Sequence, residues 1–154
     1  MFKVIKSEQI SDNFVVYNKK EQAIWFGIDL QTNFSFMLGD SYVSLEVDLG
    51  TKKIEGVYGF CPMRIFEKAS ISIPYTREKG NLYFENWDYV PGTGKTLSPK
   101  KWYFFIDKKN KTICISSNSS KYVEDGQCVE FMKNAFALIR DNSIIKLWLM
   151  FVEK

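Results

Sequence analysis

Hydrophobic and polar residues alternate most regularly in residues 41–60. The first half alternates at every second position, with Val43, Leu45, Val47 and Leu49 set against Ser44, Glu46 and Asp48. This period is typical of a strand that has one buried and one solvated face. Residues 50–53 are polar and begin with a glycine, which is free to adopt positive φ. The spacing of two then resumes at Ile54, Gly56, Tyr58 and Phe60, so residues 41–60 predict a β-hairpin.

The same criteria predict shorter strands along the chain, at residues 2–5, 13–17, 23–30, 69–74, 80–85, 102–106 and 112–115. Residues 23–30 are almost continuously apolar, as expected for a central strand covered on both faces. Residues 102–106 and 112–115 are separated by a Lys- and Asn-bearing turn, which predicts a second hairpin. Residues 86–101 form the one long irregular stretch, and loops of this length are often functional.

Two structures fit the last third of the chain. Apolar residues at steps of three and four, Val129, Met132, Phe136 and Ile139, would line one side of a helix that begins near Asp125. Alternatively, residues 135–140 pair with 143–152 across Asp141-Asn142, because both turn residues tolerate positive φ. We favour the hairpin, since residues 143–152 are rich in β-branched and aromatic side chains.

Composition supports a β fold. Aromatic residues make up 16% of the 154 residues, and aromatic side chains favour pleated, half-buried surfaces. A chain of this length buries a sufficient core without disulfides or metals. We therefore expect a single β-rich domain over residues 1–154. Its fold class is mainly β, an antiparallel sheet sandwich or barrel-like domain built from hairpins, with at most one or two short helices.

Net charge and cysteine content bear on the cellular location and on the binding partners that we expect. The net charge of +3 arises from 21 basic and 18 acidic residues spread along the chain, so nucleic-acid binding is not favoured. The apolar run 147–152 is far too short to span a bilayer. Cys61, Cys114 and Cys128 cannot all pair with one another and show no C-x-x-C spacing. We expect a cytoplasmic protein with no membrane partner.

The chain contains no histidine. This absence excludes Ser-His-Asp and Cys-His catalysis and removes the commonest zinc ligand. No carboxylate pair stands out from ordinary surface charge, and Cys61 and Cys114 have the surroundings of core residues. We therefore expect no catalytic residue, no metal site and no cofactor, and we expect that the protein is not an enzyme.

Residues 91–96, Pro-Gly-Thr-Gly-Lys-Thr, resemble the end of a phosphate-binding P-loop. A complete motif requires glycine five residues before Gly94, where this chain has Tyr89. It also requires a helix that starts at Lys95, whereas Pro99 follows within four residues. We interpret these residues as a turn.

The aromatic residues that are not needed for the core have three possible roles. They could line a ligand cavity inside a β-barrel, stack with single-stranded nucleic acid, or anchor a protein partner. Residues 85–89 favour the last role, because Trp and Tyr combine a large apolar area with a polar group. The candidate partner-binding residues are the anchors Trp87 and Tyr89 and the carboxylates Glu46, Asp48, Glu85 and Asp88, which would meet Lys or Arg of the partner.

Residues 47–62, with Ile-Pro at 73–74 and Gly-Asn-Leu at 80–82, are similar to small bacterial immunity proteins. Such proteins are encoded beside polymorphic or contact-dependent growth inhibition toxins. Residues 129–149 resemble the closing hairpin of these proteins. The resemblance implies a cytoplasmic antitoxin that occludes one cognate toxin domain, such as a nuclease, and it carries over no site residues. Immunity proteins against nucleases are frequently acidic, whereas this chain is mildly basic.

Our leading hypothesis from the sequence is a non-catalytic protein that binds and neutralises a bacterial toxin domain by covering its active or substrate-binding surface. The second hypothesis is a β-barrel that holds a small apolar ligand. The third is a domain that binds single-stranded nucleic acid, for which affinity would fall steeply with salt.

Overall fold

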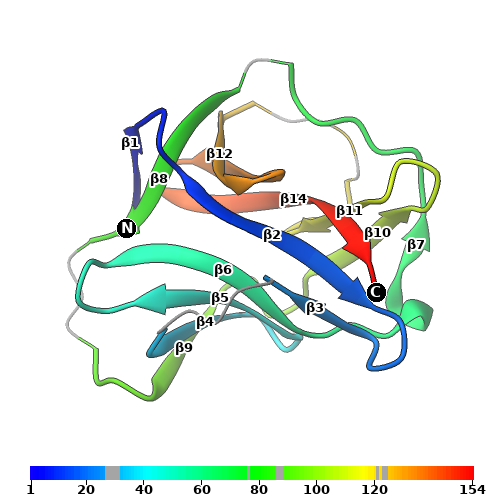
Figure 1. Ribbon diagram of the computed structural model, residues 1–154, viewed down its shortest axis with the longest axis horizontal. Helices are drawn as coiled ribbons and strands as arrows, with labels where there is room; N and C mark the ends of the chain where they lie inside the picture. The colour runs from blue at the N-terminus through cyan, green and yellow to red at the C-terminus, as the bar shows by residue number, and fades with distance from the viewer. Residues whose placement is uncertain (27–31, 76, 86–88, 121, 123–124) are drawn as a thin grey trace.

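The computed structural model describes residues 1–26, 32–75, 77–85, 89–120, 122 and 125–154. Its strands and one short 3-10 helix, η1, follow one another along the chain (Figure 1). In order they are β1 Phe2–Lys6, β2 Ser11–Asn18, β3 Ala23–Trp25, β4 Phe34–Leu38, β5 Tyr42–Asp48, β6 Lys53–Phe60, η1 Met63–Ile65, β7 Glu67–Lys68, β8 Glu78–Phe84, β9 Thr93–Leu97, β10 Tyr103–Asp107, β11 Thr112–Ser116, β12 Gln127–Lys133, β13 Ala135–Arg140 and β14 Ser143–Glu153.

The strands form two facing layers, which confirms the prediction of a mainly β fold. Figure 1 shows β6, β5, β4 and β9 in one layer, β12, β14, β11 and β10 in the other, and β2 crossing between them. The sheet order is β7-β10-β11-β14-β13-β12-β2-β3-β6-β5-β4-β9, and β8 joins β1, β12 and β6. Most neighbours are antiparallel, but β4–β9 and β14–β2 are parallel, so the sheet is mixed. No helix in the described part of the chain is long and apolar enough to cross a membrane.

The predicted opening hairpin is β5–β6, but a bulge changes which side chains it buries. The register moves from Glu46↔Gly56 to Val47↔Ile54, so Glu55 is the extra residue on β6. Beyond the bulge the inward residue is Val57, while Tyr58 and Phe60 point outward and are exposed. The sequence-based expectation that Tyr58 and Phe60 share a face with Ile54 was therefore wrong. In the turn, Lys52 rather than Gly50 has positive φ, at 63°.

The closing hairpin β13–β14 confirms the structure that we favoured for the last third of the chain. Asp141 and Asn142 have φ of 51° and 62°, as a two-residue hairpin turn with the twist of its strands requires. The helical alternative was wrong, because residues 127–133 form strand β12 and pair with β13. Strands β12 and β13 contain many apolar residues, so some of these residues are three or four positions apart although no helix forms.

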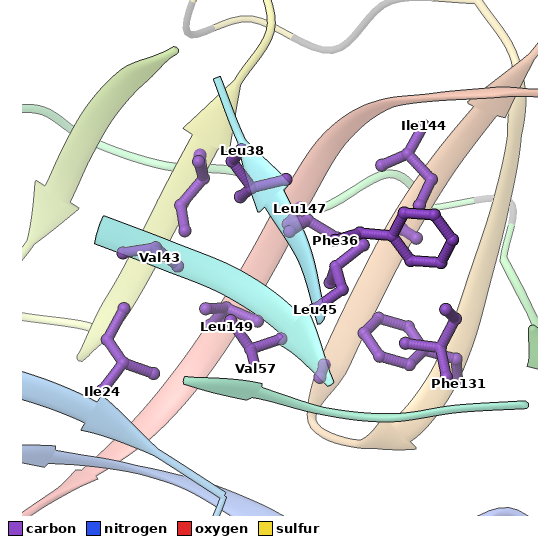
Figure 2. Packing of buried hydrophobic residues seen from close by; sticks show 14 of the residues in the cluster. Ile24, Phe36, Leu38, Val43, Leu45, Val57, Phe131, Ile144, Leu147 and Leu149 are labelled. Atoms are coloured by element: carbon purple, nitrogen blue, oxygen red, sulfur yellow. The ribbon is translucent and has the colours of Figure 1, made fainter. Parts of the chain in front are cut away.

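The main core lies between the two layers. Figure 2 shows Phe36, Leu38, Val43, Leu45 and Val57 of one layer packed against side chains of the other. Those facing side chains include Phe131, Ile144, Leu147 and Leu149. The alternate residues of β4, β5 and β6 supply this surface, as a strand period of two dictates.

The layer containing β10, β11, β13 and β14 is buried on its second face as well. A second cluster there comprises Ile71, Phe105, Cys114, Cys128, Phe136, Leu138 and Trp148. Every residue of β11 is buried, which explains its continuous apolar run. The burial of Cys61, Cys114 and Cys128 as free thiols agrees with the expectation that Cys61 and Cys114 are core residues.

Residues 69–73 cover this second face as an irregular segment, which corrects the prediction of a strand at 69–74. Ala69, Ile71 and Ile73 pack against the second cluster, so their alternation reflects burial of one side of the segment. The Ile71 N–H donates to Asp107 Oδ2 at 3.1 Å. The Asp107 carboxylate thus accepts the hydrogen bond of a backbone N–H that would otherwise pair with a neighbouring strand.

A buried lysine attaches a second covering segment to the same layer. Lys146 is fully buried in β14, and its ammonium group donates to the carbonyl oxygen of Ser120 at 2.7 Å and to that of Tyr122. These acceptors compensate for the removal of a charged group from water. Lys146 therefore ties Ser120 and Tyr122, which lie between β11 and β12, to strand β14.

Three further predictions required correction or completion. Strand β4 was not predicted, although Phe34, Phe36 and Leu38 are buried on one side of it. Residues 86–101 were expected to be irregular, yet Thr93–Leu97 forms β9. Lys95 lies within that strand, so no P-loop helix begins there. Strand β3 ends at Trp25, and residues 27–30 of the predicted strand 23–30 lie outside the described residues.

Replacing Asp107 by asparagine is expected to destabilise the protein by about 1–2 kcal/mol near neutral pH. Burial opposes ionisation of the carboxyl group, but hydrogen bonds from the Ile71 N–H and from Asn110 outweigh that effect and lower the pKa of Asp107. A lowered pKa stabilises the fold above the unfolded value of about 3.9, and this stabilisation is lost as pH falls through the folded pKa. Thermal unfolding of the Asp107→Asn variant and of the wild type at several pH values measures this loss of stability. The difference in stability between the two proteins should shrink in acid. A stability difference that is equal at every pH would contradict the role of the Asp107 carboxylate. The control is Asp12→Asn, at an exposed position of β2.

Replacing Gly59 by alanine is expected to cost at least about 2 kcal/mol of unfolding free energy. Gly59 has φ of +150°, and an added Cβ would lie 1.9 Å from the backbone oxygen of Tyr42 on the paired strand. The control is Gly50→Ala in the exposed β5–β6 turn, where the nearest atom is a side-chain oxygen of Asp48 at 3.1 Å. Chemical denaturation measures both variants. Equal stability of the two would refute the role of Gly59.

Candidate docking surface

Three aromatic side chains stand next to one another on the outer side of β5 and β6. Tyr42 is 77% exposed, Tyr58 is 49% exposed and Phe60 is 43% exposed. Tyr42 pairs with Phe60 across the two strands, and their ring centroids are 6.4 Å apart. We call Tyr42, Tyr58 and Phe60 the aromatic face. Single exposed apolar side chains are ordinary, but a contiguous group marks a candidate interaction site.

The backbone beneath the aromatic face is fixed by burial and by close strand contact. Val43 and Val57, which alternate with the exposed rings, have no exposed surface. Gly59 lies between Tyr58 and Phe60 and permits the close approach of β5 described above. The rings are therefore carried by two paired strands that are anchored to the main core, and little conformational entropy remains for a partner to remove.

Glu46 lies on the same side of β5 and has a fixed carboxylate. Ser35 Oγ donates to Glu46 Oε2 and Ser44 Oγ donates to Glu46 Oε1, both at 2.7 Å. Ser35 is the cross-strand partner of Glu46 on β4, and Ser44 is two residues away on β5. The two hydroxyl groups hold the carboxylate from two directions, which limits its rotation.

A second carboxylate at the bulge adds negative charge to this side of the hairpin. The pKa of Glu55 is raised, first by its burial and also by Asp48, while Lys53 acts in the opposite direction. Lys53 Nζ lies 3.8 Å from Glu55 Oε1. Three carboxylates therefore lie on this side of the hairpin, those of Glu46, Asp48 and Glu55, against the single ammonium group of Lys53.

A cleft of about 720 Å³ begins beside the aromatic face. Asp40 and Ser41, which directly precede Tyr42, form part of its wall. Its other lining residues come from η1, β7, β10 and the segment before β10: Ile65, Glu67, Lys100, Lys101, Trp102, Tyr103, Phe104 and Phe105, with Ser119. Lys100 Nζ is 3.8 Å from Asp40 Oδ2, and Lys101 Nζ is 5.0 Å from the centroid of the Tyr103 ring.

The residues predicted as partner contacts fall in different settings. Glu46 and Asp48 share the outer side of β5, although Asp48 Oδ1 accepts a hydrogen bond from the Gly50 N–H at 2.8 Å. Glu85 is 2.7 Å from Lys3 Nζ, and the hydrogen bond from Lys3 lowers the pKa of Glu85. It lines a separate groove of about 370 Å³.

Of the two predicted aromatic anchors, the structure describes Tyr89, which packs into the protein. The ring of Tyr89 stacks on Phe34 with centroids 4.4 Å apart and packs against the main core. Trp87 and Asp88 lie outside the described residues. Their contact with a partner stays a prediction.

Sequence reasoning missed the aromatic face because the bulge reverses the alternation of β6. An unbroken period of two places Tyr58 and Phe60 inside with Ile54, whereas the extra residue Glu55 turns them outward. The exposure of Tyr42 could have been predicted from the sequence, since Tyr42 alternates with the apolar residues of β5 in the same way as Ser44 and Glu46.

The thiols of Cys61 and Cys128 are not activated. Burial raises the pKa of Cys61, and it raises that of Cys128 to about 11, so neither thiol is an activated nucleophile. Among the residues with described positions, no group of three or more Cys, Asp or Glu side chains could hold a metal ion.

Comparison with known proteins adds no relative. No protein-family model matches the chain, and a search of curated proteins finds no significant match. The features of the structure that bear on function are the aromatic face, the Glu46 carboxylate and the cleft near the start of β5.

Proposed function

We propose that this chain is a non-catalytic protein that binds another protein through the aromatic face, and that it acts as an immunity protein against a bacterial toxin domain. The observation that carries the proposal is the set of three adjacent exposed rings on a rigid strand pair. Aromatic residues dominate the energetics of protein interfaces, because they bury a large area and lose little side-chain entropy.

Charge favours a protein partner over single-stranded nucleic acid. A surface that stacks with nucleic-acid bases needs basic residues beside the rings, to contact the phosphates. The carboxylates of Glu46, Asp48 and Glu55 lie on this side of the hairpin with Lys53 alone among the described cations of β5 and β6. This arrangement repels a phosphate backbone and attracts a basic protein surface.

The alternative of a ligand held inside a β-barrel lacks a comparable observation. Side chains of the main core occupy the space between the two layers (Figure 2). The cleft beside the aromatic face is instead lined in part by exposed residues, including Asp40, Ile65 and Glu67.

The proposed mechanism is occlusion. The aromatic face would cover the active or substrate-binding surface of the toxin, and the cleft would receive a projecting part of it. The resemblance of residues 47–62 to immunity proteins supports this role and implies a cytoplasmic location, where such a toxin would act.

Tyr42→Ala is expected to weaken binding to the cognate toxin at least about tenfold, because a central aromatic anchor contributes on the order of 2 kcal/mol. The toxin to use is the product of the gene next to that for this chain. Affinity is measured by calorimetry with a catalytically inactive toxin, and protection is measured as growth of bacteria that express the active toxin.

The matched control is Tyr75→Ala, since Tyr75 is fully exposed and lies away from β5 and β6. This variant should bind and protect like wild type. The proposal fails if the neighbouring genes encode no toxin that this chain binds, or if Tyr42→Ala and Tyr75→Ala bind equally well.

A further inference from the structure

We propose that the outer side of the β5–β6 hairpin recognises an arginine side chain of the partner, with the guanidinium group paired to Glu46 and stacked on Tyr58. This inference rests on the proposed function and specifies the chemistry of the partner at that surface. It is drawn from the position of one carboxylate, its two serine donors and one exposed ring.

The hydrogen bonding of Glu46 favours a forked donor. Each carboxylate oxygen accepts one hydroxyl hydrogen, Oε2 from Ser35 and Oε1 from Ser44. A carboxylate offers about four acceptor positions, so one further position remains on each oxygen. Two parallel N–H groups of a guanidinium fill two such positions together, whereas a lysine ammonium acts as a single point charge.

Tyr58 lies where a guanidinium paired to Glu46 would need a flat surface. Its cross-strand partner is Ser44, while the partner of Glu46 is Gly56, so Tyr58 and Glu46 are diagonal neighbours on one side of the sheet. Diagonal neighbours are within reach of long and aromatic side chains. The Tyr58 ring is 49% exposed, and arginine stacks well on aromatic rings.

The surrounding charges leave Glu46 available for a cation. Lys53 is 3.8 Å from Glu55, and none of the ion pairs of the described residues includes Glu46. Asp48 and Glu55 on the same side of the hairpin add to the negative potential. The neighbours of Glu46 on the paired strands are small, Ser35 on β4 and Gly56 on β6, and the Phe26 ring lies over Gly56.

The test uses N-acetyl-arginine amide as the probe and N-acetyl-lysine amide as its matched control, titrated into the full chain and followed by NMR. We expect saturable shifts in the millimolar range for the Tyr58 ring and for the amides of Ser35 and Ser44 with the arginine probe. The lysine probe should bind at least several-fold more weakly. Glu46→Gln should abolish the shifts, whereas Glu8→Gln, at an exposed residue on another segment, should leave them unchanged.

The double variant Ser35→Ala/Ser44→Ala tests whether arginine is preferred because the carboxylate is held in place or only because it is charged. It keeps Glu46 but removes both donors, so it should reduce the preference for arginine over lysine while cation binding persists. Thermal unfolding checks that each variant is folded. Equal binding of the two probes, shifts confined to other residues, or unchanged binding by Glu46→Gln would overturn the inference.

The proposed function can be judged apart from this result. If the arginine probe fails while Tyr42→Ala still disrupts the toxin complex, the recognition of arginine is wrong and the docking surface stands. If the probe binds but Tyr42→Ala has no effect on a toxin complex, the cation site is real and the proposed use of the aromatic face is wrong.

Discussion

The layer formed by β10, β11, β13 and β14 is buried on both faces, and this determines which surfaces of the protein remain exposed. One face packs against β4, β5 and β6, and the other is covered by residues 69–73, with Ser120 and Tyr122 bonded to Lys146 of β14. On β4, β5 and β6, alternate side chains face this core and the others face away from it. The outer side of β5 and β6 is therefore left to display side chains that the core does not need, which is where the aromatic face lies.

A single extra residue decides what that outer side displays. Without the bulge at Glu55, the strand period would turn Tyr58 and Phe60 into the main core and Val57 to solvent. With it, two rings join Tyr42 outside while smaller aliphatic residues fill the core. β-Bulges re-aim side chains and are frequent near functional sites, so the irregularity in β6 supports the interpretation of this surface as functional.

Much of the fold followed from the sequence, because strand alternation and turn chemistry are local. The β5–β6 and β13–β14 hairpins were predicted from alternation and from turn residues such as Asp141 and Asn142. The segment 69–73 was mistaken for a strand, since burial of one side produces the same alternation without pairing. Strand β9 carries no apolar pattern and exists through its pairing with β4, which local sequence does not show. Of the candidate site, Glu46 and Asp48 were predicted, whereas Tyr58 and Phe60 were hidden by the bulge.

If the outer side of β5 and β6 meets another protein, its three rings lose contact with solvent in the complex. Hydroxyl-radical footprinting of the free chain and of its toxin complex tests this directly, because tyrosine and phenylalanine rings react in proportion to their exposure. The account predicts that Tyr42, Tyr58 and Phe60 become protected in the complex while Tyr75 and Tyr122, exposed elsewhere, react as before. Protection of Tyr75 or Tyr122 with an unchanged aromatic face would contradict it.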